Sequence, residues 1–123
     1  MIKLSKTEEK IMGHLWEMKR AYLKEIIECF PEPKPATTTL ATLLKRMVDK
    51  KVIDFEQHGK SRLYFPLVQK KAYFKNTVGE MVSNFFNNSP VQFASFFTKE
   101  NDLSKDELKD LQTLINEQIK KLE

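Results

Sequence analysis

The 123-residue sequence has one cysteine, three glycines and no long apolar run. Cys29 cannot form an internal disulfide, and we expect it to pack as a small hydrophobic side chain. No apolar stretch approaches the roughly 20 residues that a membrane span requires. Residues 1–10 lack the apolar segment of a secretion signal, so we expect a soluble protein of the cytoplasm.

Catalytic and metal-binding patterns are also missing. The sequence contains no glycine-rich phosphate loop, no visible Ser-His-Asp arrangement and no activated Cys-His pair. His14 and His58 have no cysteine or carboxylate at metal-ligand spacing. We therefore expect no enzymatic activity, no metal and no small-molecule cofactor.

Positive charge is confined to one half of the chain. Residues 1–68 carry 13 Lys or Arg against 9 Asp or Glu, whereas residues 69–123 carry 8 of each. The whole net charge of +4 therefore lies in the first half. A basic half joined to a neutral half suggests that only the first meets a polyanion.

Three helical patterns occupy the first 50 residues. The first helix is expected to begin near Thr7, because Ser5 and Glu8 have the spacing of a capping box. It carries Trp16 on its apolar face, where we expect a core residue. A short second helix covers 23–30 and is ended by the prolines that follow it.

The third helical pattern has a narrow apolar stripe and a compact polar face. Leucine, methionine and valine recur over 40–48 at spacings of three and one. At about 100° per residue, polar and basic residues fall on the opposite face. These are Thr38, Thr39, Thr42, Lys45 and Arg46.

A β-hairpin is expected next. Residues 53–56 alternate as a half-buried strand, 58–61 read as a turn with Gly59 and Lys60, and 62–65 read as the returning strand. Three helices followed by a hairpin is the order of a winged helix-turn-helix. In that fold a helix enters the DNA major groove while the hairpin touches the backbone.

The second half predicts three more helices. Their signals are an apolar stripe over 74–86, an N-cap at Ser89 followed by Pro90, and a second capping box at Ser104 and Glu107. We thus expect a mainly α fold with a small β-hairpin: a winged-helix DNA-binding domain at 1–68 and a three-helix dimerisation domain at 69–123.

Phenylalanine is concentrated in this second region. Six of the nine phenylalanines lie between Phe74 and Phe97, too many for three short helices to bury alone. A second copy of the chain is the expected partner, since most soluble oligomers are twofold homodimers. An internal core and a ligand pocket are the alternatives. The expected dimer contacts are Phe85, Phe86, Phe93, Leu111 and Ile115.

Nearly the whole chain resembles the penicillinase repressor family of the BlaI/MecI type, which also includes copper-responsive repressors. The motifs that carry the resemblance are Ser5-Lys6-Thr7-Glu8, Ile11-Met12, Leu15-Trp16, Thr39-Leu40 through Arg46-Met47, Ile53, Gly59-Lys60-Ser61-Arg62, Tyr64-Phe65-Pro66 and Asp102-Leu103-Ser104. The resemblance implies a dimeric repressor on a palindromic operator. It also implies relief by a proteolytic cut in the dimerisation region, triggered by a membrane sensor with a zinc protease domain.

The family's cut falls at an Asn-Phe bond, and the matching bond here is Ser95-Phe96. Three further departures concern regulation and helix ends. Ala36-Thr37-Thr38-Thr39 replaces the family's Ser-Pro-Lys-Thr, and Lys51 replaces a glycine after the third helix, which must then end in another way. No cysteine-rich motif follows Cys29, which disfavours copper sensing.

The predicted function is therefore a repressor that binds double-stranded DNA as a homodimer. Its DNA contacts are expected at Thr38, Thr39, Thr42, Lys45, Arg46, Lys60 and Arg62, with the threonines at bases and the cations at phosphates. The alternative is a winged helix that docks a protein without sequence-specific DNA binding. Salt dependence separates the two, because DNA binding releases counterions. Induction by a ligand or by dilution is the alternative to proteolysis.

Overall fold

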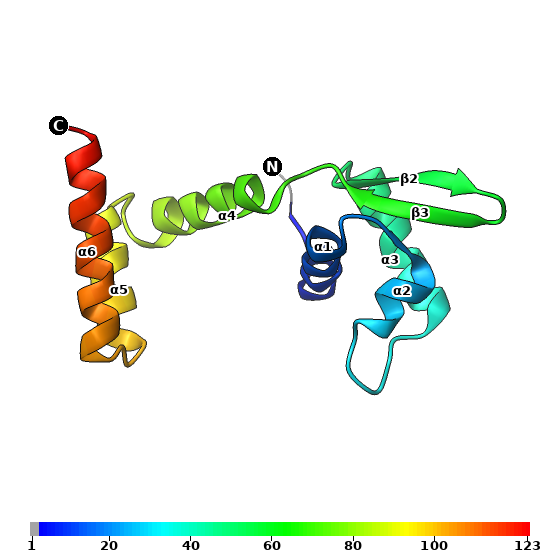
Figure 1. The fold of residues 1–123 in the computed structure, drawn as a ribbon, viewed down its shortest axis with the longest axis horizontal. Helices are drawn as coiled ribbons and strands as arrows, with labels where there is room; N and C mark the ends of the chain where they lie inside the picture. The colour runs from blue at the N-terminus through cyan, green and yellow to red at the C-terminus, as the bar shows by residue number, and fades with distance from the viewer. Residues whose placement is uncertain (1–2) are drawn as a thin grey trace. The chain divides into compact units, whose positions relative to one another are not determined.

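The computed structural model describes residues 3–123 (Figure 1). Its elements are α1 (Lys6–Met18), β1 (Ala21–Tyr22), α2 (Leu23–Glu28), α3 (Thr37–Asp49), β2 (Ile53–His58), β3 (Ser61–Pro66), α4 (Lys70–Phe85), α5 (Pro90–Glu100) and α6 (Lys105–Lys121). They form two compact units, one ending at Asn76 and the other spanning Thr77–Glu123. The mainly helical winged helix-turn-helix class is confirmed. No helix within residues 3–123 is both long and apolar enough to cross a membrane.

Local signals place the helix ends correctly. Ser5 is the N-cap of α1, where its side chain accepts from the Glu8 amide while the Glu8 carboxylate accepts from the Ser5 amide. Ser104 and Glu107 repeat this capping box at α6. Both boxes were predicted because each needs only residues three apart in the sequence.

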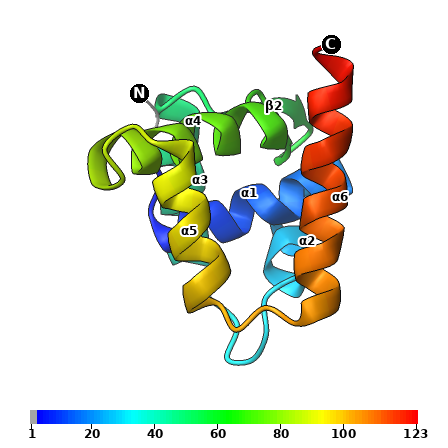
Figure 2. The ribbon, with the colours of Figure 1, turned by 90° about the vertical axis from the view of Figure 1, so that its left-hand side faces the viewer.

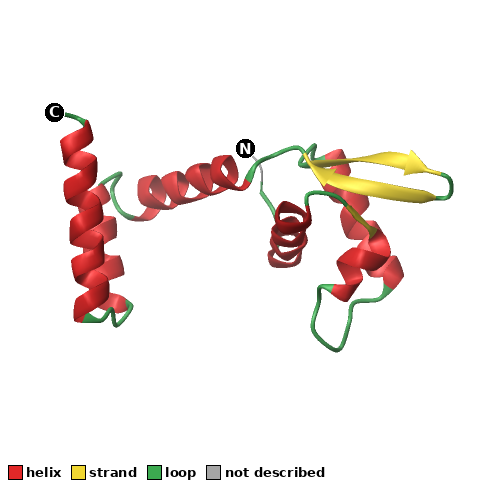
Figure 3. Ribbon diagram, in the orientation of Figure 1, coloured by secondary structure: helices red, strands yellow, loops and turns green. Residues whose placement is uncertain are grey.

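The sheet has one strand more than the sequence predicts. β2 and β3 pair as the expected antiparallel hairpin, with His58 opposite Ser61, and extend beyond the helices as the wing (Figure 3). The two-residue strand β1 pairs with the other edge of β3 and gives the order β1-β3-β2. Two residues are too few to show an alternating pattern, so this strand escapes sequence reasoning.

The core of the first unit joins all three N-terminal helices to the sheet. Its fully buried side chains are Ile11, Met12, Leu15, Ile26, Leu40, Leu44, Met47, Val52 and Ile53. Trp16 packs against this core but remains partly exposed. The expectation for Cys29 is wrong, because this residue is exposed at the end of α2 and its thiol contacts the Met18 sulfur at 3.5 Å.

The start of α4 belongs to the first unit because aromatic side chains attach it to α1. The Trp16 ring lies 5.9 Å from Tyr73 and 5.8 Å from Phe74, measured between centroids. The indole nitrogen of Trp16 donates to the Val68 carbonyl at 2.8 Å, and the Tyr73 hydroxyl donates to the Glu9 carboxylate. Residues beyond Val68 therefore complete the winged helix.

Lys51 ends α3 by adopting the backbone conformation that usually calls for glycine. Its φ is 63°, in the left-handed region. The Lys51 amide donates to the Val48 carbonyl at 2.9 Å and the Val52 amide to the Met47 carbonyl at 3.1 Å. These two bonds form a Schellman motif, which a left-handed residue after the C-cap makes possible. The helix thus keeps the usual termination at a steric cost of about 1 kcal/mol.

A buried ion pair joins the start of α1 to the end of α3. Glu8 is only 3% exposed, and the Lys50 ammonium donates to both its oxygens, at 2.8 and 3.1 Å. Burial by itself raises the pKa of Glu8, but the hydrogen bonds from Lys50 and Ser5 outweigh it. The pKa therefore lies below that of an ordinary glutamate.

Replacing Lys50 by methionine should lower the free energy of unfolding by about 1–3 kcal/mol at pH 7, because a buried carboxylate loses its partner. In the wild type the depressed pKa of Glu8 contributes stability above the unfolded pKa of about 4.3, and this contribution disappears as pH falls through the folded value. The difference in stability between the Lys50→Met variant and the wild type should shrink in acid, because the buried Glu8 of the variant has lost its lysine and takes up a proton. Urea unfolding at pH 7 and pH 4 measures both effects.

Lys51→Met is the matched control, since it removes the adjacent exposed ammonium, which forms none of the described ion pairs. It should change stability little at either pH. Equal losses in the two variants, or a Lys50→Met loss that does not depend on pH, would contradict the role assigned to the Glu8–Lys50 pair.

The second unit has no buried core of its own. Not one residue in Thr77–Glu123 reaches full burial, and most of its large apolar side chains are exposed on three helices. α5 and α6 run in opposite directions from a short connection (Figure 2). Aromatic contacts within the unit are local: Phe86 lies 5.5 Å from Phe93 and 5.4 Å from Phe96.

Candidate nucleic-acid interface

α3 separates an apolar face from a polar one. Leu40, Leu44 and Met47 are fully buried on its inner side. The residues predicted to contact DNA on this helix are all exposed: Thr38, Thr39, Thr42, Lys45 and Arg46. The outer face thus carries hydroxyl, methyl and cationic groups on a cylinder that fits the major groove of B-DNA.

The three threonines are not equivalent. The Thr42 hydroxyl donates to the Thr38 carbonyl one turn earlier, at 2.9 Å. Its hydrogen is therefore engaged, while the oxygen lone pairs and the methyl group remain available. In this rotamer Thr42 can accept from an adenine or cytosine amino group or pack on a thymine methyl, but it cannot donate.

The wing carries both of the cations that were predicted for it, Lys60 in the loop at its tip and Arg62 in the adjoining strand. Gly59 has φ 63° and is the first of two loop residues, a position that favours glycine in a tight hairpin. The Gln57 amide donates to the carbonyls of Gly59 and Ser61, at 3.0 and 3.3 Å, and so braces the turn. Lys60 and Arg62 are both exposed there.

A groove of about 700 Å³ lies between the wing, α2 and α3. Lys60 and Arg62 line it from the wing and Ala41 from α3. Lys24, at the start of α2, adds a third cation that sequence reasoning missed. Only the pairing of β1 with β3 brings Lys24 beside the wing, and that pairing has no sequence signal.

Acidic groups near the wing are already engaged. The Glu56 carboxylate is 3.4 Å from Arg20 and 3.2 Å from His58. The Glu25 carboxylate accepts from the Tyr22 amide at 2.8 Å, which caps α2. Glu25 lines the same groove as Lys24, Lys60 and Arg62. The cations of α3 and of the wing form none of the ion pairs among the described residues, so they are available to a polyanion.

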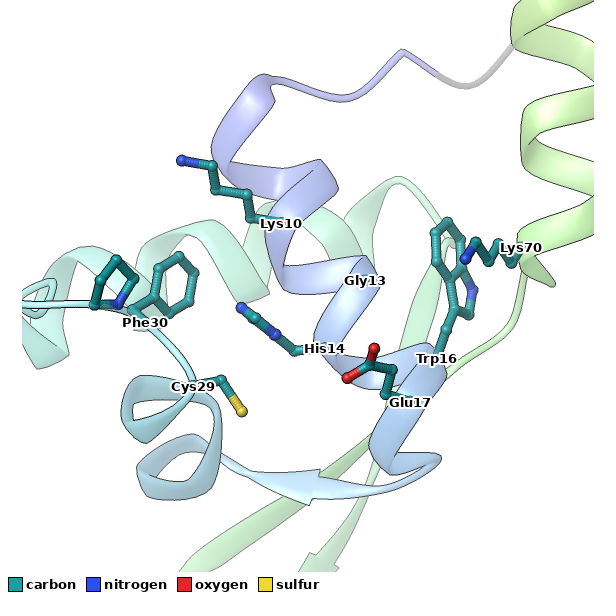
Figure 4. A pocket seen from close by; sticks show the side chains of 9 residues that line it. Lys10, Gly13, His14, Trp16, Glu17, Cys29, Phe30 and Lys70 are labelled. Carbon is teal, nitrogen blue, oxygen red and sulfur yellow. The ribbon is translucent and has the colours of Figure 1, made fainter. Parts of the chain in front are cut away.

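A second groove, of about 620 Å³, lies on α1 and the end of α2 (Figure 4). His14 lies there edge-to-face with Phe30, 5.1 Å between ring centroids. None of the residues predicted to bind DNA lines this groove. Within residues 3–123, no group of three or more His, Cys, Asp or Glu side chains is placed to hold a metal.

The exposed helix face and the wing have the arrangement of a DNA-binding winged helix, and the family model described as penicillinase repressor matches residues 4–117. The chain belongs to the penicillinase repressor family. It is accordingly a winged-helix transcriptional repressor and not an enzyme.

Relatives of this chain cover nearly its full length. The methicillin resistance regulatory protein MecI of Staphylococcus aureus strain N315 is 29% identical over 92% of this chain and 93% of that protein. MecI of Mammaliicoccus sciuri is 28% identical with the same coverage. The solution structure of the DNA-binding domain of the repressor BlaI shares the fold, with a TM-score of 0.51 and 21% identity over 58% of this chain and 88% of that domain.

The residues predicted to form the dimer interface differ in exposure, and the bond predicted to be cleaved lies in a helix. Phe86, Phe93 and Leu111 are partly buried, whereas Phe85 and Ile115 are 79% and 57% exposed. The Ser95–Phe96 bond lies inside α5, where the Ser95 carbonyl accepts from the Thr98 hydroxyl at 3.3 Å. The bond is therefore helical, and a protease needs local unfolding to reach it.

Proposed function

We propose that this repressor binds a palindromic operator as a homodimer, with α3 in the major groove and the wing against the backbone. The observation that carries this proposal is that α3 has two different faces. Its apolar face is buried in the core, and its polar and basic face is exposed. Thr38, Thr39 and Thr42 are assigned to base edges. Phosphate contacts are assigned to Lys45, Arg46, Lys60 and Arg62.

Dimerisation is assigned to the C-terminal region around Phe85, Phe86, Phe93, Leu111 and Ile115. Its support is the absence of any fully buried residue in Thr77–Glu123, together with apolar side chains that are exposed on every helix there. A surface of this kind gains stability when a second copy covers it. Two winged helices joined in this way match the twofold symmetry of a palindrome.

Relief of repression is assigned to cleavage at Ser95–Phe96 by a membrane-bound sensor metalloprotease. The support is the family to which the chain belongs and the position of this bond between the two ends of the proposed dimerisation region. A cut there separates α6 from α4 covalently, which weakens a dimer that depends on both.

Replacing Arg46 by alanine should weaken binding to operator and to scrambled DNA alike, because a phosphate contact carries no sequence information. The slope of log affinity against log salt should fall by about 1 for each phosphate that the variant no longer neutralises. The measurement is fluorescence anisotropy over a salt series, with a duplex from the region beside its own gene and a scrambled duplex. Thr39→Ala should instead reduce discrimination between the duplexes and leave the slope unchanged.

Lys10→Ala is the matched control, since it removes one exposed charge from α1 and should leave the salt slope as it is. An Arg46→Ala slope equal to that of the wild type would remove Arg46 from the interface. Binding that does not weaken with salt would favour the alternative function, docking of a protein on this face.

A further inference from the structure

Arg62 lies on the face of the wing that continues into the core. Pairing of β2 with β3 sets Phe55 opposite Tyr64 and Gln57 opposite Arg62. Side chains two apart on a strand share a face, so these four residues lie on one side of the hairpin. Tyr64 is 7% exposed on this side, whereas Arg62 near the tip is exposed.

Phe55 links the Arg62 guanidinium to the core. The Cζ atom of Arg62 lies 4.3 Å from the centroid of the Phe55 ring, within the range of a cation–π contact. The Phe55 ring in turn lies 5.7 Å from that of Tyr64, again between centroids. An exposed arginine on a projecting hairpin is thereby attached through two rings to a rigid part of the fold.

The contact with Phe55 leaves the N–H donors of the guanidinium free. These donors lie in the plane of the group and point outward, and the Phe55 ring carries no oxygen or nitrogen acceptor that could occupy them. None of the ion pairs among the described residues includes Arg62. Its donors are therefore available to a phosphate, while the contact with Phe55 restricts the rotation of the side chain.

We propose that Phe55 is a positioning residue for DNA binding, which holds Arg62 ready to engage a backbone phosphate of the duplex. The inference rests on the proposed function and adds a residue without a polar side-chain group, which acts through Arg62. A lysine or a freely rotating arginine loses side-chain freedom when it binds, whereas the arginine in contact with Phe55 has already lost part of it.

Phe55→Leu in the full-length protein should weaken DNA binding about 2- to 5-fold per wing, and thus about 4- to 25-fold for a dimer. Its salt slope should equal that of the wild type, because Arg62 still reaches the phosphate. Phe55→Tyr keeps the ring and should restore affinity. The probe is the duplex from beside its own gene, titrated by fluorescence anisotropy.

A double-mutant cycle separates positioning from a merely structural role. In an Arg62→Ala background, Phe55→Leu should have no further effect on affinity, since the group it positions is gone. An equal loss in both backgrounds would overturn the proposal. So would an unchanged affinity of Phe55→Leu when Arg62→Ala alone weakens binding.

Failure of the proposed function gives a different pattern. If Arg62→Ala leaves the affinity and the salt slope unchanged, the assignment of Arg62 to phosphate fails, and the role of Phe55 fails with it. A second measurement needs no DNA: the side-chain protons of Arg62 should show an upfield NMR shift from the Phe55 ring current, absent in Phe55→Leu and kept in Phe55→Tyr. Arg62 protons at ordinary positions in the wild type would overturn the stacking.

Discussion

Full-length protein carrying Phe85→Asp and Ile115→Asp should be monomeric at micromolar concentration and should bind its operator about 100- to 10,000-fold more weakly than the wild type. Both side chains are mostly exposed in the single chain, and both lie in the unit that lacks a core. Carboxylates at these positions must be desolvated if a second copy covers them. Loss of the dimer turns the second half-site contact into a separate bimolecular event.

The matched control is Asn84→Asp with Asn116→Asp, which adds the same charge at the adjacent exposed polar positions. Sedimentation velocity gives the oligomeric state, and a mobility-shift titration gives the affinity. The control should remain dimeric and bind as the wild type does. A wild-type protein that sediments as a monomer at micromolar concentration would refute the dimer.

A fragment without the dimerisation region gives the same comparison, provided that it ends at Asn76. The sequence suggests an end at Val68, but a fragment cut there loses the rings of Tyr73 and Phe74 from the side of Trp16. It also loses the bond from the Tyr73 hydroxyl to Glu9. The longer fragment keeps these interactions, so weak DNA binding by it reflects loss of the dimer and not a damaged winged helix.

Cleavage at Ser95–Phe96 should lower operator affinity by a similar factor of about 100 to 10,000, because the cut chain loses the dimer. Mass spectrometry of the protein from induced cells should then find fragments ending at Ser95 and beginning at Phe96. α5 has no fully buried residue in the single chain, so its local unfolding exposes little core. An intact chain during full derepression would exclude proteolysis and leave a ligand or dilution as the inducing route.

Two substitutions at position 95 make this test sharper. The family's cut follows an asparagine, so Ser95→Asn should be cut faster than the wild type under the same induction. Ser95→Ala is its control, because it changes the same turn of α5 without supplying the amide. Equal cleavage rates for the two variants would show that the protease does not read this position.

Much of the candidate interface could be predicted from the sequence because its signals are local. The apolar stripe over 40–48 determined which side of α3 is buried, and therefore which residues it exposes. Gly59 between two alternating runs determined the hairpin and the place of Lys60 at its tip. Each of these patterns depends on residues a few positions apart, whose spacing is read directly.

Interactions between distant segments could not be predicted in this way. Lys24 reaches the groove beside the wing through the two-residue strand β1, and Lys50 reaches Glu8 across 42 positions. Lys51 ends its helix in the left-handed conformation, which a lysine in the sequence does not indicate. In the sequence Phe55 is an ordinary strand residue. Only the pairing of β2 with β3 brings its ring into contact with the Arg62 guanidinium.

The sequence by itself determined the helices, the hairpin and the polar face of α3, because hydrogen bonding and periodicity within one segment are enough to specify them. Only the tertiary structure decided which side chains from different elements contact one another. In that structure Cys29 is exposed, and Glu8 is buried in an ion pair with Lys50. The second unit has exposed apolar side chains and no fully buried residue. The physical reason is that burial depends on what other segments cover, and no single segment carries that information.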